Sequence, residues 1–206
     1  MKFQPCIVGI GGTTRAGSST EKALRSIGHE VERLGGRWEL FSGPQLILPT
    51  YQRGASERSA GTLLMVDAMR NCDALVIGSP GYHGSFSGLI KNALDYVEDL
   101  ASETRPYLAG RAVGCVATGL GWQAIGTTLA SLRTVVHAMG AWPTPMGVAM
   151  STAGKVFGDA GEVLVPAVRL ELDTLAFQLV EFARMRHQYM GSPSSHRLTS
   201  DVPATV

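Results

Sequence analysis

The sequence contains few of the residues and segments that mark exported, membrane-bound or disulfide-stabilised proteins. Its 206 residues include three cysteines, Cys6, Cys72 and Cys115, an odd number at wide spacing that does not suggest a disulfide framework. No apolar run approaches the length of a membrane-spanning helix, and the run at residues 6–10 is far shorter than the core of a signal peptide. We therefore expect a protein of the reducing cytoplasm, with no export signal and no membrane association.

Charge is also scarce, and neither sign dominates. The lysines and arginines number 18 and the aspartates and glutamates 17, so the net charge of +1 does not attract a polyanion and nucleic acid is not expected as a partner. The five histidines are scattered, and none forms a metal-ligand pair with a cysteine or carboxylate. The Gly-x-Ser-x-Gly motif of many serine hydrolases is absent as well. These absences argue against a metal centre and against the simplest hydrolase chemistry.

Apolar residues, by contrast, are plentiful. They make up 45% of the chain, against 17% charged residues, which is ample for the packed core of one domain. We predict this domain over residues 1–190. Residues 191–206 are rich in Ser, Pro and Thr, so we predict a polar tail that is disordered or ordered only against a neighbouring subunit.

Short apolar runs alternate with segments of helical periodicity along the whole domain. The expected strands cover residues 6–10, 38–41, 73–78, 111–118 and 146–150. The expected helices cover residues 19–34, 56–71, a segment from about 87, 124–139 and 162–186. Strict alternation of this kind predicts an α/β fold in which a doubly wound, five-stranded parallel sheet carries helices on both faces. Ligands of such sheets bind beyond the carboxyl ends of the strands, where three glycine-rich loops are expected to meet.

The first of these loops, at residues 11–20, joins glycines to hydroxyl side chains and an arginine at the start of a helix. Free backbone N–H groups, the helix dipole and a guanidinium are the parts of a phosphate site. Ser18 stands where a P-loop has its lysine, and Thr14 stands where a dinucleotide fingerprint has its third glycine. We therefore predict a site for one terminal phosphate, with capping and turn formation as the alternative role. The polar residues around this helix start are Thr13, Thr14, Arg15, Ser18, Ser19 and Thr20.

The second and third loops are suited to a flat ligand. Residues 79–87 combine proline and glycines with Tyr82 and His83, so that backbone can approach a ligand closely beside an aromatic side chain. His83 could act as a general base, but a structural or packing role is favoured because no carboxylate lies near it in the sequence. Residues 118–123 offer further backbone N–H groups and Trp122, with a tight turn as the alternative interpretation.

These residues resemble the NAD(P)H-dependent FMN reductase family, the flavodoxin-like group that includes chromate, quinone and azo-compound reductases and the reductase partners of flavin-dependent monooxygenases. The most specific segment is residues 79–95, which matches the family's Pro-x-Tyr followed by Ser/Pro-Gly-x-x-Lys-x-x-x-Asp. The resemblance covers about residues 6–185. It implies a flavodoxin-like sheet with strand order 2-1-3-4-5, FMN as cofactor and NADPH or NADH as hydride donor.

The resemblance also implies which residues bind FMN. The phosphate would be held by Thr13, Arg15, Ser18 and Thr20. The ribityl chain and ring would be bordered by Pro80, Gly81, Tyr82 and His83, and the ring's other side by Thr118, Gly119 and Gly121. We predict that Ser19, Gly84 and Ser85, in the first two of these loops, also bind the cofactor. The chain departs from the family in having threonine at positions 13 and 20, where serine and asparagine are common, and in the Trp122-Gln123 pair of the third loop. No catalytic side chain is expected, because the chemistry belongs to the cofactor.

The expected function is hydride transfer from NAD(P)H to FMN and on to a quinone-like acceptor or a partner flavin-dependent monooxygenase. The alternatives are a flavodoxin-type electron carrier and a non-catalytic flavin-binding regulator. Electron carriers tend to be strongly acidic and to lack a loop arginine, whereas this chain is nearly neutral and has Arg15. The family resemblance and the apolar loops around Tyr82 and Trp122 predict a homodimer or homotetramer.

Overall fold

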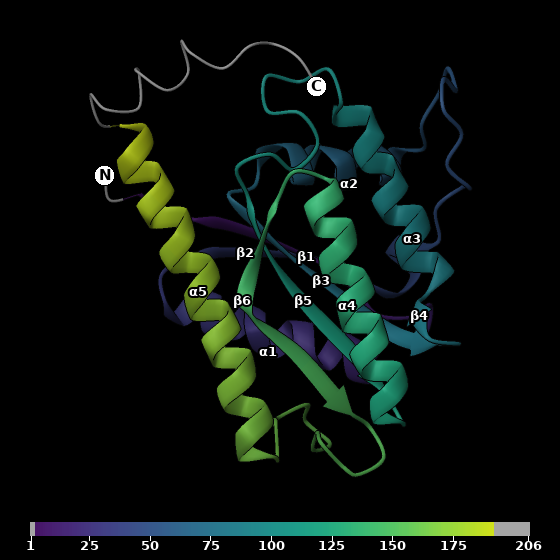
Figure 1. The fold of residues 1–206 in the computed structure, drawn as a ribbon, viewed down its shortest axis with the longest axis vertical. Coiled ribbons are helices and arrows are strands. Elements are labelled where there is room, and N and C mark those ends of the chain that lie inside the picture. Colours follow the sequence, from purple (N-terminus) through teal and green to yellow (C-terminus); the bar gives the residue numbers. More distant parts are fainter. Residues whose placement is uncertain (1–2, 192–206) are drawn as a thin grey trace.

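The computed structural model describes residues 3–191, which form one sheet with helices packed along it (Figure 1). The strands are β1 (Cys6–Gly11), β2 (Arg37–Phe41), β3 (Ala74–Tyr82), β4 (Ser85–Phe86), β5 (Ala112–Gly119) and β6 (Trp142–Ser151). The α-helices are α1 (Ser19–Arg33), α2 (Ala60–Asn71), α3 (Gly88–Asp95), α4 (Trp122–Ala138) and α5 (Pro166–Met190). Two 3-10 helices are η1 (Gly43–Leu46) and η2 (Tyr96–Leu100). All but Gly191 of the predicted tail lies outside the described residues.

The five long strands run parallel in the order β2-β1-β3-β5-β6. This is the predicted order 2-1-3-4-5, because the expected fourth and fifth strands are β5 and β6. The order reverses between β1 and β3, which creates the crevice where such folds bind ligands. At this point Gly11 pairs with Gly78, and a Cβ on Gly11 would lie 2.3 Å from the Gly78 carbonyl oxygen, so the two strand ends touch backbone to backbone.

A sixth strand, β4, was not predicted. It pairs antiparallel with the end of β3, matching Gly81 with Phe86 and Tyr82 with Ser85. The turn between them consists of His83 and Gly84, both with positive φ (51° and 86°), as a two-residue hairpin requires. The expected loop is therefore a hairpin that projects from the carboxyl edge of the sheet.

The predicted starts of three elements were also wrong, each by four residues. The helix expected from residue 56 begins at Ala60, where Ser59 accepts the backbone N–H of Thr62 as N-cap. The last helix begins at Pro166 instead of 162, because Val163 forms a bridge with Phe157 before it. The last strand begins at residue 142 instead of 146, although residues 143 and 145 are prolines, and it lies at an edge of the sheet where a missing N–H is tolerated.

Both faces of the sheet are buried, which explains the continuous apolarity of its strands. On one face Ile7 packs with residues of α1 and α5 such as Leu24 and Leu172. On the other face the next residue, Val8, packs in a cluster with α2, α3 and α4 that includes Met65 and Leu132. The carboxyl ends of the strands are left open between these layers. No helix among residues 3–191 is long and apolar enough to span a membrane.

Candidate functional site

A cleft of about 410 Å³ lies at the carboxyl edge of the sheet, around the ends of β1, β3, β5 and β6. This volume is within the range of small-molecule sites. The lining residues are Thr13, Arg15, Ser18, Ser19, Thr20, Pro80, Gly81, Tyr82, Thr118, Gly119, Leu120, Gly121, Ala124 and Thr152.

Nearly all of the predicted site residues meet in this cleft. Every residue assigned to a cofactor from the first and third loops lines it, and Pro80, Gly81 and Tyr82 line it from the second loop. His83, Gly84 and Ser85 do not line it, because they form the turn and return strand of the β3–β4 hairpin. The structure thus brings three separate loops to one place, while the binding role of each residue remains a prediction.

Three lining residues were missed by the sequence reasoning. Thr152 follows β6, and its position after the last parallel strand was the available signal. Its backbone N–H and its hydroxyl both donate to the Gly119 carbonyl oxygen, at 2.7 and 3.1 Å, so it joins the end of β6 to the third loop. Leu120 and Ala124 belong to the loop and first turn that lead into α4. No local pattern distinguished these two apolar residues.

The first loop leaves the start of α1 open for an anion. Ser18 caps the helix by accepting the Glu21 N–H at 3.2 Å. The preceding N–H groups of Ser19 and Thr20 have no intrahelical acceptor, as in the first turn of any α-helix, and no other acceptor among residues 3–191 takes them. These donors and the positive end of the helix dipole border the cleft, so an anionic group is favoured there.

Glu21 holds this loop in shape from behind. Its side chain is buried, one oxygen accepts the Gly17 N–H at 3.0 Å and the other forms a 2.7 Å ion pair with Arg25. Gly17 has φ of +71°, a conformation that suits glycine. Arg25 compensates the charge of the carboxylate, which lies close to the anion-binding end of the helix.

Arg15 brings a positive charge to the lining of the cleft. Its backbone is fixed by Thr13, whose hydroxyl accepts the Arg15 N–H at 3.2 Å and donates to the Arg15 carbonyl oxygen at 3.1 Å. Its side chain forms no hydrogen bond or ion pair with any other residue in the described range 3–191. The guanidinium is therefore available to a ligand in the cleft.

The remaining walls are close-packed backbone with an apolar rim. A Cβ on Gly81 would lie 2.7 Å from the Thr128 hydroxyl oxygen, so the end of β3 lies directly on α4. Tyr82, Leu120 and Trp122 are exposed around this region, at 53%, 75% and 67%. Apolar side chains exposed next to a cleft indicate a surface that a flat apolar ligand or another protein covers.

Residues 5–155 match the NADPH-dependent FMN reductase family. Among curated proteins, the FMN-dependent NADPH-azoreductase of Staphylococcus saprophyticus is 34% identical over 84 residues, which is 40% of this chain and 37% of the relative. The matched segment therefore spans little more than a third of that protein.

Solved structures with the same architecture include two flavin oxidoreductases and a flavodoxin. The NAD(P)H:(acceptor) oxidoreductase FerB of Paracoccus denitrificans has a TM-score of 0.73 at 18% identity, covering 88% of this chain and 98% of that chain. The NADH:FMN oxidoreductase EMOB has a TM-score of 0.65 at 23% identity, covering 97% of this chain and 100% of that chain. A flavodoxin of Streptococcus pneumoniae has a TM-score of 0.57 at 15% identity, covering 85% of this chain and 98% of that chain. These likenesses confirm the flavodoxin-like fold. Since the family match extends over most of its length, the chain belongs to the NADPH-dependent FMN reductase family.

Proposed function

We propose that the protein is an oxidoreductase that binds FMN in the cleft and uses NADPH or NADH to reduce a quinone-like acceptor. The observation that carries this proposal is that, in a family member, an open helix start, an arginine without an ion-pair partner in residues 3–191 and two glycine-containing loops converge on one cleft at the switch point of the sheet. FMN, when bound, supplies the capacity to accept a hydride and to pass its electrons on.

The residues of the first loop fit the phosphate of FMN. The N–H groups of Ser19 and Thr20 and the guanidinium of Arg15 would donate to its oxygens, and the helix dipole would stabilise its charge. One such cradle is present at the cleft, which suits a single terminal phosphate. This favours FMN over a dinucleotide.

The other two loops fit a planar ring. The segment Pro80–Tyr82 and the segment 118–121 both line the cleft, and their glycines at positions 81, 119 and 121 would let a flat ligand approach the backbone closely. Tyr82 and Leu120 border the same space and are exposed, so they would shield the ligand from water on its outer side. The role of the chain would thus be to bind and orient FMN, and we do not propose that any side chain transfers a proton.

We include in this proposal the electron acceptor, a protein partner and the oligomeric state. The azoreductase name of the curated relative supports a small, electron-poor acceptor, and a flavin-dependent monooxygenase is the alternative destination of the electrons. The exposed Tyr82, Leu120 and Trp122 support a homodimer or homotetramer that covers them. The free, buried thiols of Cys6, Cys72 and Cys115 are compatible with a cytoplasmic location.

Steady-state oxidation of NADPH and NADH with purified protein, FMN and a quinone tests the activity. We expect oxidation that saturates with FMN and far exceeds the rate with free FMN alone. A protein that binds FMN but leaves this rate unchanged would instead be a flavodoxin-type carrier or a regulator. Light scattering on the same sample tests the assembly, and a monomer would contradict that part of the proposal.

A further inference from the structure

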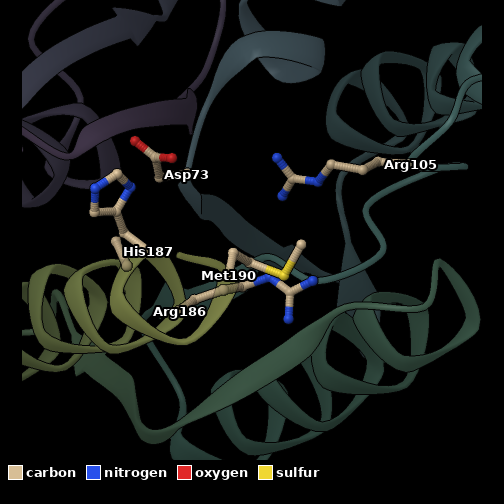
Figure 2. Close-up of a pocket in the computed structure, with 6 residues that line it drawn as sticks. Asp73, Arg105, Arg186, His187 and Met190 are labelled. Carbon is tan, nitrogen blue, oxygen red and sulfur yellow. The ribbon is translucent and has the colours of Figure 1, made fainter. Parts of the chain in front are cut away.

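A second cavity, of about 210 Å³, lies at the opposite, amino-terminal edge of the sheet. It is bordered by the residue before β3, the loop before β5 and the last two turns of α5. We refer to it as the basic cavity. Its lining residues are Asp73, Arg105, Ala183, Arg186, His187 and Met190. In Figure 2, Arg105 extends from its loop toward Arg186 and Met190 of α5, while Asp73 and His187 lie at the other side of the view.

The two arginines of the basic cavity have no carboxylate partner among residues 3–191. Within the described part of the chain, the Arg105 side chain forms one hydrogen bond, a long one of 3.4 Å to the Ala109 carbonyl oxygen. Arg186 lies against Gly110, where a Cβ would be only 2.4 Å from its guanidinium. The loop before β5 therefore contains Arg105 and also packs against the guanidinium of Arg186.

A third guanidinium lies behind them. Arg111 is 1% exposed and donates to the carbonyl oxygens of Arg70, Cys72 and Tyr107, at 2.6, 3.3 and 3.4 Å. These acceptors satisfy its hydrogen bonds but carry no charge. A buried charge normally has an ion of opposite sign beside it, because desolvation is costly without one.

Within residues 3–191, no carboxylate forms an ion pair with any of these three arginines, and Glu103, which lies near Arg105 and Arg111, is paired with Arg70. Asp73 is the one carboxylate of the described chain that lines the basic cavity, and one of its oxygens accepts the Cys6 backbone N–H at 2.8 Å. The carboxyl end of α5 adds only the partial charge of its terminal carbonyl groups. Consistent with this excess, the pKa of Arg105 is lowered by burial and then by the charges of Arg111 and Arg186.

The size of the basic cavity limits what can compensate this charge. At about 30 Å³ per water molecule it has room for a few water-sized groups, and it is smaller than the pockets that hold nucleotides or drug-sized ligands, which begin near 300 Å³. Guanidinium pairs recognise the oxygens of phosphate and carboxylate groups with particular geometric fit. We propose that the basic cavity is a binding site for a small multivalent oxyanion of the phosphate class.

This site is distinct from the proposed FMN cleft. Asp73 and Pro80 stand at the two ends of β3, and a strand of this length spans about 20 Å. An anion in the basic cavity would therefore contact neither FMN nor its acceptor. It would neutralise the arginine cluster and stabilise the packing of α5 against the loop before β5.

Inorganic phosphate is the probe for the test, with the protein saturated with FMN so that the first loop is already occupied. Calorimetry and melting temperature are measured with increasing phosphate at constant ionic strength. We expect binding and a rise in melting temperature for the parent protein. Arg105→Gln and Arg186→Gln should each weaken phosphate binding by about ten- to a hundredfold, and FMN affinity should stay unchanged. Arg53→Gln, which removes an equal charge from an exposed arginine outside the cavity, should behave as the parent.

Three further outcomes would contradict the proposal. An equal response to phosphate in the parent and in Arg105→Gln/Arg186→Gln would show that the anion binds elsewhere, and no response in the parent would show that the cavity has no such affinity. A change of oligomeric state in the double variant would identify the arginines as part of a subunit contact. Because the first loop is filled with FMN in every arm, these results do not depend on the proposed enzymatic activity.

Discussion

The hydroxyl oxygens of Thr20 and Thr118 lie 2.6 Å apart, in a buried hydrogen bond that joins the first turn of α1 to the end of β5. β1 precedes α1, and β3 lies between β1 and β5 in the sheet, so this bond crosses the strand that contributes Pro80 and Tyr82. It fixes the first loop relative to the third loop. Both threonines also line the cleft, so the bond couples its shape to the stability of the fold.

Thr20→Val should therefore destabilise the protein by about 1–3 kcal/mol, because it leaves the Thr118 hydroxyl buried without its partner. Thr118→Val should cost a similar amount. The double variant should cost clearly less than the sum of the two, since it leaves no unpaired hydroxyl. Urea unfolding of all four proteins without flavin measures this cycle, and additive losses would show that the bond contributes nothing.

Arg15→Ala should weaken FMN binding by about ten- to a hundredfold, the loss of one charge-assisted hydrogen bond of roughly 1.5–3 kcal/mol. The fold should survive, because the Arg15 side chain forms no hydrogen bond or ion pair with any other described residue. At saturating FMN the rate of hydride transfer should change by less than about tenfold, as expected when uniform binding is removed.

Riboflavin, which lacks the phosphate, provides the matched comparison for Arg15. The parent should bind FMN more tightly than riboflavin, and Arg15→Ala should narrow that difference while leaving riboflavin affinity unchanged. If the FMN dissociation constant of Arg15→Ala lies within about twofold of the parent value, Arg15 does not bind the phosphate.

FMN should bind more tightly than FAD. The first loop offers one helix start and one free guanidinium, which suit a terminal phosphate and not an adenylated one. Isothermal calorimetry with both flavins measures the preference. Equal or tighter binding of FAD would mean that the cleft accommodates a second phosphate and an adenine.

Gly81→Ala should destabilise the protein by about 1–3 kcal/mol through overpacking. The new methyl group would lie 2.7 Å from the Thr128 hydroxyl oxygen and 3.1 Å from the Ala124 carbonyl oxygen. Because the buried Thr128 hydroxyl has no hydrogen-bond partner among residues 3–191, Thr128→Ala should cost little stability and should partly rescue Gly81→Ala. Thermal unfolding of the single and double variants checks this, and an absence of rescue would place the strain at the backbone of α4.

The carboxylate of Asp173 should lower the free energy of unfolding at neutral pH, and this destabilising contribution should disappear in mild acid. Burial, and then the charge of Glu30, raise the pKa of its carboxyl group above the ordinary value of 3.8. A raised pKa means that the folded state binds the proton more tightly, so this penalty is present above the folded pKa and disappears as the pH falls towards 3.8. Asp173→Asn should raise the melting temperature at pH 7 and lose that advantage on acidification. An equal gain at both pH values would assign the effect to packing.

Much of the fold and of the candidate site could be predicted from local patterns. Continuous apolar runs such as residues 74–78 indicated strands buried on both faces, and their alternation with helices required them to be parallel. Parallel strands end at the same edge, so the loops that carry Arg15, Tyr82 and Gly119 had to come together there. Most of the cleft could be predicted because its location depends only on the direction of each strand.

Tertiary structure alone decided what depends on contacts between distant segments. Strand spacing decides that Thr20 bonds to Thr118 and that Thr152 lies in the wall of the cleft. The hairpin turn decides that His83 lies outside the cleft. The basic cavity is the clearest case, because Arg105 and Arg186 belong to a loop and a helix with no shared motif. The sequence by itself determined the fold and the location of the cleft, since hydrophobic periodicity reports which faces of an element are buried and the alternation of strands with helices makes the strands end at one edge. It could not determine which charged side chains would meet, because that depends on the packing of whole elements against one another.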